Sequence, residues 1–125
     1  MTPEGRVKKK ISAVLAKYKQ THYLYYYMPV PGGFGRQSLD YLGFVNGFGF
    51  AIEAKRPGGK PTPRQLGCIE EIEKSRATVF VIDGDQGVAE LERWLETIVT
   101  VVLGRYYHVG LSAGDQDAPQ GAAAA

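Results

Sequence analysis

The stretch LDYLGFVNGFGFAIEAK, residues 39–55, decides the fold that we expect for this chain. Two β-prone segments flank Asn46 and Gly47, and both of these residues tolerate the positive φ that a type I′ turn requires. We therefore predict a β-hairpin with a two-residue loop. In that register Asp40 lies opposite Glu53, and facing residues of a hairpin point to the same side of the sheet.

Strand alternation places Lys55 on the same side as Glu53, so the open end of the hairpin gathers two carboxylates and an ammonium. Like charges that face each other on a sheet are destabilising, and two such carboxylates tend to be held by a divalent cation or to share a proton. Oxygen ligands of this kind suit Mg²⁺ or Mn²⁺. The alternative is a solvated strand end, because a register shift of one residue sends Asp40 to the other face.

Length and composition predict one globular domain. The chain has 125 residues, of which 44% are hydrophobic and 22% charged, enough for a core. No apolar run approaches the roughly 18–20 residues of a membrane span, and we recognise no signal peptide. The single cysteine, Cys68, excludes an internal disulfide and a cysteine-based zinc site; it falls on an apolar helix stripe, so we expect a buried thiol. A reducing cytoplasm fits these features.

The charges are unevenly distributed along the chain. Residues 1–64 hold eleven Lys/Arg and three acids, a balance of +8, whereas residues 65–125 hold four Lys/Arg and ten acids, a balance of −6. The three acids of the basic half are Glu4, Asp40 and Glu53. A basic half that reserves its carboxylates for one site suits a polyanionic substrate that is brought to a metal.

The N-terminal segment has the pattern of an amphipathic helix that ends at about residues 17–19. Thr2 can cap it, and Pro3 suits the first helical position. Glu4 lies at the edge of the apolar stripe, so we expect it to face the sheet, and it also favours the helix dipole. The lysines mostly occupy the outer face, where a consecutive run either contacts DNA or is simply solvated. That run is Lys8, Lys9 and Lys10.

Further elements precede and follow the hairpin. The tyrosine-rich sequence of residues 23–30 predicts a first strand. We expect the glycine-rich loop after it to let the phosphate backbone of a nucleic acid approach closely, with Arg36 as a contact. Both faces of the hairpin are largely apolar, so we expect a layer of helices on each. Residues 78–82 predict a short apolar strand, central in the sheet and parallel to a neighbour.

Two helices surround that last strand. Thr62 and Gln65 form a capping box that starts one of them, and its inner stripe consists of Leu66, Cys68, Ile69 and Ile72. Gln65 is either only the capping residue or also reaches a metal-bound water or the substrate. The last helix ends near Gly104. We expect a domain over residues 1–111 and a low-complexity, flexible tail over residues 112–125.

The order helix, strand, strand, strand, helix, strand, helix, with Asp40 on one strand and the Glu53-x-Lys55 motif on the next, resembles the PD-(D/E)xK nuclease superfamily. More narrowly it resembles the virus-type replication-repair nuclease (VRR-NUC) domain, over roughly residues 2–98. Glu4 in the first helix and Gln65 in the second complete the pattern. One departure is Leu39, where the family usually has a proline that ligates nothing.

This resemblance implies an α/β (α+β) fold with a restriction-endonuclease-like core, element order αβββαβα, and a mixed central sheet flanked by helices. It implies that Asp40 and Glu53 bind Mg²⁺ or Mn²⁺, with the backbone carbonyl of Ala54 as a further ligand. Glu4 then assists through a second metal or a water.

The resemblance also implies catalytic roles for two further residues. Lys55 orients the attacking water and offsets charge in the transition state, and Gln65 positions Lys55 or the nucleophile. Metal coordination makes water a better nucleophile and neutralises the phosphate. Preorganised positive charge at the developing anion is usually the largest catalytic contribution.

The implied activity is that of a metal-dependent, structure-specific DNA endonuclease on branched DNA, similar to a Holliday-junction resolvase. Such a DNA-repair enzyme from a bacterium or a phage-infected cell works as a homodimer, since two symmetric cuts need two sites. Leu91, Trp94 or the pair Val101-Val102 then belong to the interface or to the core. The expected DNA contacts are Lys8, Lys9, Lys10, Arg36, Arg56, Lys60 and Arg64. The alternatives are a non-catalytic DNA-binding module and a sequence-specific restriction-type nuclease.

Overall fold

The helices and strands follow each other in the order that the sequence predicts. The structure, a computed structural model, describes residues 1–30 and 38–112, with side chains through residue 100. Its elements are α1 (Pro3–Thr21), β1 (Leu24–Tyr27), β2 (Tyr41–Val45), β3 (Phe48–Ala54), α2 (Pro63–Lys74), β4 (Thr78–Ile82) and α3 (Asp85–Ser112). The described residues thus form an α+β fold with a mixed four-stranded sheet and three helices.

The four strands lie in the order β1-β2-β3-β4 across the sheet. The first three are antiparallel to one another, and α2 then leads the chain to β4, which pairs in parallel with β3. Asn46 and Gly47 have φ angles of 49° and 86° and connect Val45 to its facing residue Phe48. The predicted hairpin and its two-residue loop are therefore confirmed.

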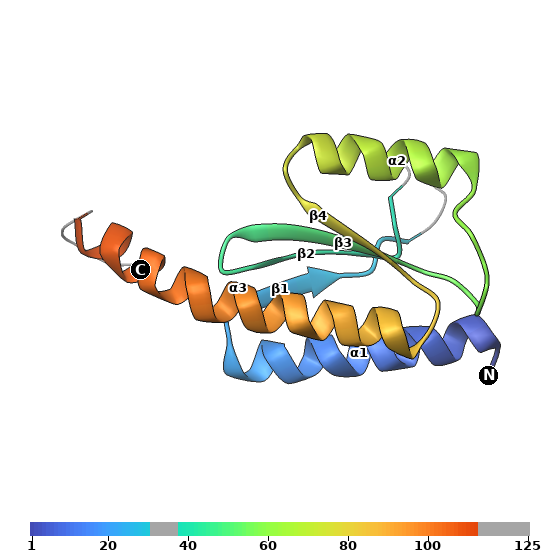
Figure 1. The fold of residues 1–125 in the computed structure, drawn as a ribbon, viewed down its shortest axis with the longest axis horizontal. Coiled ribbons are helices and arrows are strands. Elements are labelled where there is room, and N and C mark those ends of the chain that lie inside the picture. Colours follow the sequence, from blue (N-terminus) through green and yellow to red (C-terminus); the bar gives the residue numbers. More distant parts are fainter. Residues whose placement is uncertain (31–37, 113–125) are drawn as a thin grey trace.

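Strand β4 is parallel to its neighbour, as predicted, but the prediction that it is central is wrong, because β4 lies at an edge of the described sheet. Its apolar sequence has a different cause. Helix α3 lies on one side of the sheet and α2 on the other (Figure 1), and a strand with a helix on each face favours apolar residues even where the covering is partial. Ile82 is buried, whereas Val81 is 42% exposed.

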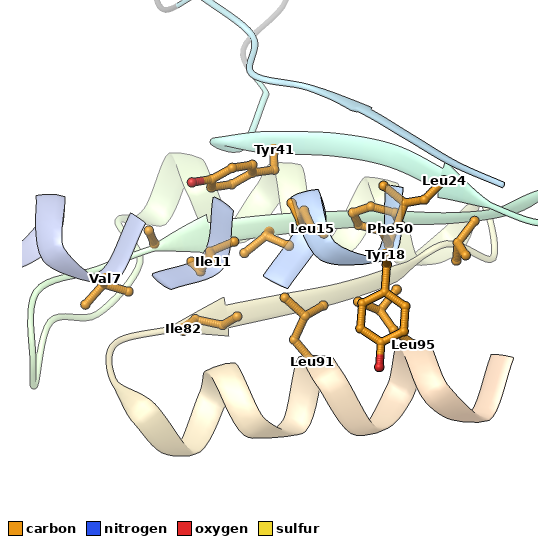
Figure 2. Packing of buried hydrophobic residues seen from close by; sticks show 13 residues of the cluster. Val7, Ile11, Leu15, Tyr18, Leu24, Tyr41, Phe50, Ile82, Leu91 and Leu95 are labelled. Atoms are coloured by element: carbon orange, nitrogen blue, oxygen red, sulfur yellow. The ribbon is translucent and has the colours of Figure 1, made fainter. Parts of the chain in front are cut away.

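The hydrophobic core lies between the sheet and the pair formed by α1 and α3, which run side by side on one face (Figures 1 and 2). The helices contribute side chains at helical spacing: Val7, Ile11, Leu15 and Tyr18 from α1, and Leu91 and Leu95 from α3. The ring of Trp94 packs edge-on against Phe50 and Phe80. Leu91 and Trp94 therefore serve the core, and the side chains of Val101 and Val102 lie outside the described part.

The opposite face of the sheet is only partly covered, so the layer of helices predicted for each face of the hairpin is present but incomplete on this side (Figure 1). No residue of α2 is buried, and Leu66, predicted for its inner stripe, is 53% exposed. Helix α2 packs mainly on β4, so Phe44 on β2 stays 53% exposed. For the same reason Cys68 is half-buried and not fully buried as expected.

Two elements differ in length from their predicted ranges. Strand β1 covers Leu24–Tyr27 instead of residues 23–30, since Pro29 lacks the N–H that a ladder needs. Helix α3 continues to Ser112 instead of ending near Gly104, because one glycine costs a helix only about 1 kcal/mol and no proline follows it there. The predicted tail lies outside the described residues, apart from Ser112.

Candidate metal centre

The hairpin brings Asp40 and Glu53 together as predicted. The pairing of Tyr41 with Ile52, extended by one residue, places Asp40 opposite Glu53. Asp40 stands just before β2, and its Oδ2 accepts a hydrogen bond of 2.9 Å from the backbone N–H of Ala54. The carboxylate of Asp40 therefore occupies the place that a backbone acceptor would have if the ladder continued.

Glu53 is the one buried charged side chain among the described residues, with 4% exposure. Its Oε2 accepts a hydrogen bond of 2.8 Å from Nε2 of Gln65 and lies 3.6 Å from Nζ of Lys55. Burial, and then the charge of Asp40, raise the pKa of Glu53 to about 7, although Lys55 acts in the opposite direction. Burial and the charge of Asp40 thus outweigh the effect of Lys55, and the pKa of Glu53 lies near neutral pH.

Gln65 has the predicted capping role and, in addition, contacts Glu53; whether it reaches a metal-bound water or the substrate stays a prediction. Its backbone N–H donates to Oγ1 of Thr62 at 3.2 Å, and its Oε1 accepts from the backbone N–H of Thr62 at 3.0 Å, which completes the capping box of α2. The same side chain donates through Nε2 to Glu53. The start of α2 is therefore fixed to the carboxylate pair, and the contact of Gln65 is with Glu53, not with Lys55.

At the end of β3, one backbone N–H points toward β4 and the one before it points toward Asp40. The N–H of Lys55 donates to the carbonyl of Ile82 in β4 at 2.8 Å, whereas the N–H of Ala54 points to Asp40. Because the N–H and C=O of one residue in an extended strand point to the same side, the Ala54 carbonyl also faces the Asp40 side. This orientation is the one that the predicted role of Ala54 as a backbone ligand requires.

Glu4 reaches the site through Lys8. The ammonium of Lys8 lies 3.6 Å from Oε2 of Glu4 and 3.6 Å from Oδ1 of Asp40. Partial burial lowers the pKa of Lys8, but the two carboxylates outweigh this effect and the pKa is raised. Sequence reasoning missed this inward position of Lys8, which it placed on the outer, DNA-contacting face. The sequence does contain an indication that Lys8 pairs with Glu4, since the two residues are spaced i, i+4 on the helix.

The other predicted DNA contacts differ in their surroundings. Lys9 is exposed, but Lys10 forms an ion pair of 2.6 Å with Asp85 at the start of α3. Both side chains of this pair are exposed, and an exposed ion pair is weak, so the prediction that Lys10 contacts DNA stays a prediction. Three further cations are exposed in the segment from the end of β3 to the start of α2: Arg56, Lys60 and Arg64. Arg36 lies outside the described residues.

The donor set fits one divalent cation with water ligands. Within residues 1–30 and 38–100, no group of three or more His, Cys, Asp or Glu side chains is placed to hold a metal ion. Two carboxylates and a carbonyl suit Mg²⁺, which is typically bound by one or two carboxylates and keeps several waters. The charge of Asp40, which contributes to the raised pKa of Glu53 after burial, supports the same ligand.

Compared with protein-family models and with curated proteins, the chain matches none. Of the helices in the described residues, none combines the length and the hydropathy that crossing a membrane requires.

Proposed function

We propose that this protein is a Mg²⁺- or Mn²⁺-dependent endodeoxyribonuclease that hydrolyses phosphodiester bonds in branched DNA. One observation carries the proposal: the facing carboxylates of Asp40 and Glu53, with Glu53 buried and Lys55 beside it. Such a pair destabilises the metal-free fold at neutral pH, and strongly perturbed carboxylates of this kind concentrate at functional sites. The family implied by Asp40, Glu53-x-Lys55, Glu4 and Gln65 is the VRR-NUC branch of the PD-(D/E)xK nucleases.

The side chains around the pair have separable roles in this proposal. When bound, the cation supplies charge neutralisation of the phosphate and a more acidic water. Asp40 and Glu53 hold it, and Gln65 fixes the orientation of Glu53 through its hydrogen bond. Lys55, whose side chain is 15% exposed, places a positive charge where negative charge develops on the phosphate.

The charge distribution supports a nucleic acid as the substrate. The basic half of the chain carries a balance of +8, and Arg56, Lys60 and Arg64 are exposed in the segment that follows Lys55. Contacts between such side chains and phosphates position a duplex without reading its sequence. The specificity then comes from the shape of the DNA at a branch.

A homodimer is part of the proposal, since cutting both strands of a junction symmetrically needs two sites. The surface that supports it is the partly covered sheet face on the α2 side, which exposes Tyr25, Tyr27, Phe44 and Val81. None of these side chains is charged, so the surface suits a second apolar surface better than phosphates. With about 150–250 Å² for a full aromatic side chain, the exposed parts amount to several hundred Å², so a stable dimer, which buries about 800 Å² per partner, would need further residues around this surface.

The dimer is tested separately from the chemistry. Light scattering coupled to gel filtration should give the mass of two chains for the wild type and of one chain for Phe44→Lys. Both proteins should bind Mn²⁺ equally. A monomeric wild type would remove the dimer from the proposal, while the nuclease would stand. The location that goes with this function is the cytoplasm of a bacterium or of a phage-infected cell.

The test of the function compares a four-way junction with a linear duplex of the same sequence, in Mg²⁺ and in EDTA. Asp40→Asn is the chosen variant, because its side-chain oxygen keeps an acceptor for the Ala54 N–H. Metal-dependent cleavage of the junction alone, lost in Asp40→Asn, is the expected result. Equal cleavage of both substrates would keep the nuclease and discard the junction specificity.

Two alternatives give different results in the same experiment. A non-catalytic DNA-binding module would bind the junction tightly and cleave nothing with any metal. A restriction-type nuclease would cut the linear duplex at a fixed sequence. The carboxylate pair, in which Glu53 is buried, favours the enzyme over the binding module, because a buried charge is costly and perturbed carboxylates concentrate at functional sites.

A further inference from the structure

The ammonium of Lys8 lies close to two carboxylates, Glu4 and Asp40, that are candidate metal ligands. Its ammonium lies 3.6 Å from Glu4 and 3.6 Å from Asp40, and its side chain is 34% exposed. The neighbouring Lys9 is exposed and has no ion pair in the described part of the chain. The inward position is therefore specific to Lys8 and is not a general property of the lysine run.

The backbone of α1 is fixed at this residue. The hydroxyl of Tyr41, which is fully buried, donates to the carbonyl of Lys8 at 3.0 Å and forms a second hydrogen bond of 2.9 Å with Oγ of Ser12. Tyr41 directly follows Asp40 in the chain. The same short segment thus carries the carboxylate and fixes the helix turn from which Lys8 reaches it.

The two oxygens of Asp40 face different partners. Oδ2 accepts the N–H of Ala54, and Oδ1 is the atom nearest to Lys8. A carboxylate has about four lone-pair sites, so Asp40 keeps capacity for a cation on the Glu53 side. On the Glu4 side a positive charge is already present.

Resting on the proposed metal-dependent function, we propose that Lys8 takes the place of a second divalent cation. The site then binds one cation, between Asp40 and Glu53, and Glu4 acts by orienting Lys8 and not as a metal ligand. The physical reason is repulsion: an ammonium 3.6 Å from both carboxylates neutralises the charge that would attract a second cation and repels that cation directly.

The test counts Mn²⁺ ions on the full chain, by calorimetry and by the spin-resonance signal of free Mn²⁺, without DNA. Wild type should bind one ion. Lys8→Met keeps the length of the side chain but removes its charge, so it should bind a second ion between Glu4 and Asp40, for which the exposed Glu4 side chain can move. Lys8→Met combined with Glu4→Gln should return to one ion, and so should Lys8→Arg. Lys9→Met is the matched control, with one ion.

The outcomes separate this inference from the function on which it rests. Two ions on the wild type, one ion on Lys8→Met, or two ions on the double variant would each overturn the role of Lys8 and leave the nuclease in place. No ion on the wild type would overturn both. Circular dichroism shows whether each variant is folded, and Lys8→Gln replaces Lys8→Met if the latter is not.

Discussion

The side-chain amide of Gln65 donates to Oε2 of Glu53 at 2.8 Å while its carbonyl oxygen caps the first turn of α2. One residue of a helix start thus orients a buried carboxylate of β3. Thr62 takes part in the cap but makes no such contact with Glu53. The two residues therefore allow the effect of the cap to be separated from the effect on the carboxylate.

Gln65→Ala and Thr62→Ala should destabilise the protein to a similar extent, because each removes the capping box. The expected loss is about 1 kcal/mol in the free energy of unfolding. Only Gln65→Ala should also weaken Mn²⁺ binding and junction cleavage, by about 10–100-fold, as is common when a partner of a metal ligand is lost. Urea unfolding and calorimetry measure the two quantities. An equal loss of activity in both variants would show that Gln65 acts through the helix alone.

Lys55→Ala should lower cleavage by at least about 100-fold, because a fixed positive charge at a developing anion is worth this much in comparable sites. Binding to the junction should persist, which a gel-shift assay can measure. The control is Lys74→Ala, since Lys74 is exposed and pairs with Glu70, another exposed side chain of α2. Full cleavage by Lys55→Ala would contradict the role assigned to it.

Without metal, the stability should fall as the pH rises from about 4.5 to about 7. Glu53 titrates near pH 7 in the folded protein, against 4.5 as its ordinary value, so in this window the folded state binds more protons than the unfolded chain. Stability then decreases with pH, by up to about 3 kcal/mol for this group. Glu53→Gln should lose this pH dependence and be more stable than the wild type at pH 8.

Thermal unfolding in EDTA at several pH values measures this effect. Glu70→Gln, which changes an exposed carboxylate on α2, is the matched control and should keep the dependence of the wild type. An unchanged pH dependence in Glu53→Gln would mean that another group is responsible. The burial of Glu53 and its contact with Asp40 would then contribute less than the geometry indicates.

Mn²⁺ affinity should rise with pH and then level off. The cation competes with the proton on Glu53, whose pKa is about 7, and metal ligands must be deprotonated to bind. Below pH 7 the affinity should change about tenfold per pH unit, and above it the change should be small. Calorimetric titrations between pH 5.5 and 8.5 would measure this, and a flat profile would exclude Glu53 as a ligand.

The sequence predicted the hairpin and the facing of Asp40 and Glu53 because both depend on local rules. The Asn46-Gly47 turn sets the register, and strand alternation then determines which side chains share a face. The cap formed by Thr62 and Gln65 is equally local. These features involve residues close in the chain, so no knowledge of the packing was needed.

The positions that the sequence did not predict depend on how the elements pack. Lys8 turns inward because Tyr41 fixes its helix turn beside Asp40, and helical periodicity alone places it outside. Similarly, the exposure of Phe44 follows from the docking of α2 over β4. The apolar pattern of a strand does not predict how much of its surface a helix will cover.

The hydrogen bond from the Ala54 N–H to Asp40 has a consequence for binding entropy. A flexible aspartate loses rotamer freedom when it ligates an ion, which reduces affinity. Here the side chain of Asp40 is already fixed, because it completes the ladder between β2 and β3. Folding has therefore ordered this proposed ligand before any cation arrives, and replacing Asp40 by alanine would remove both the proposed ligand and the last rung of the ladder between β2 and β3.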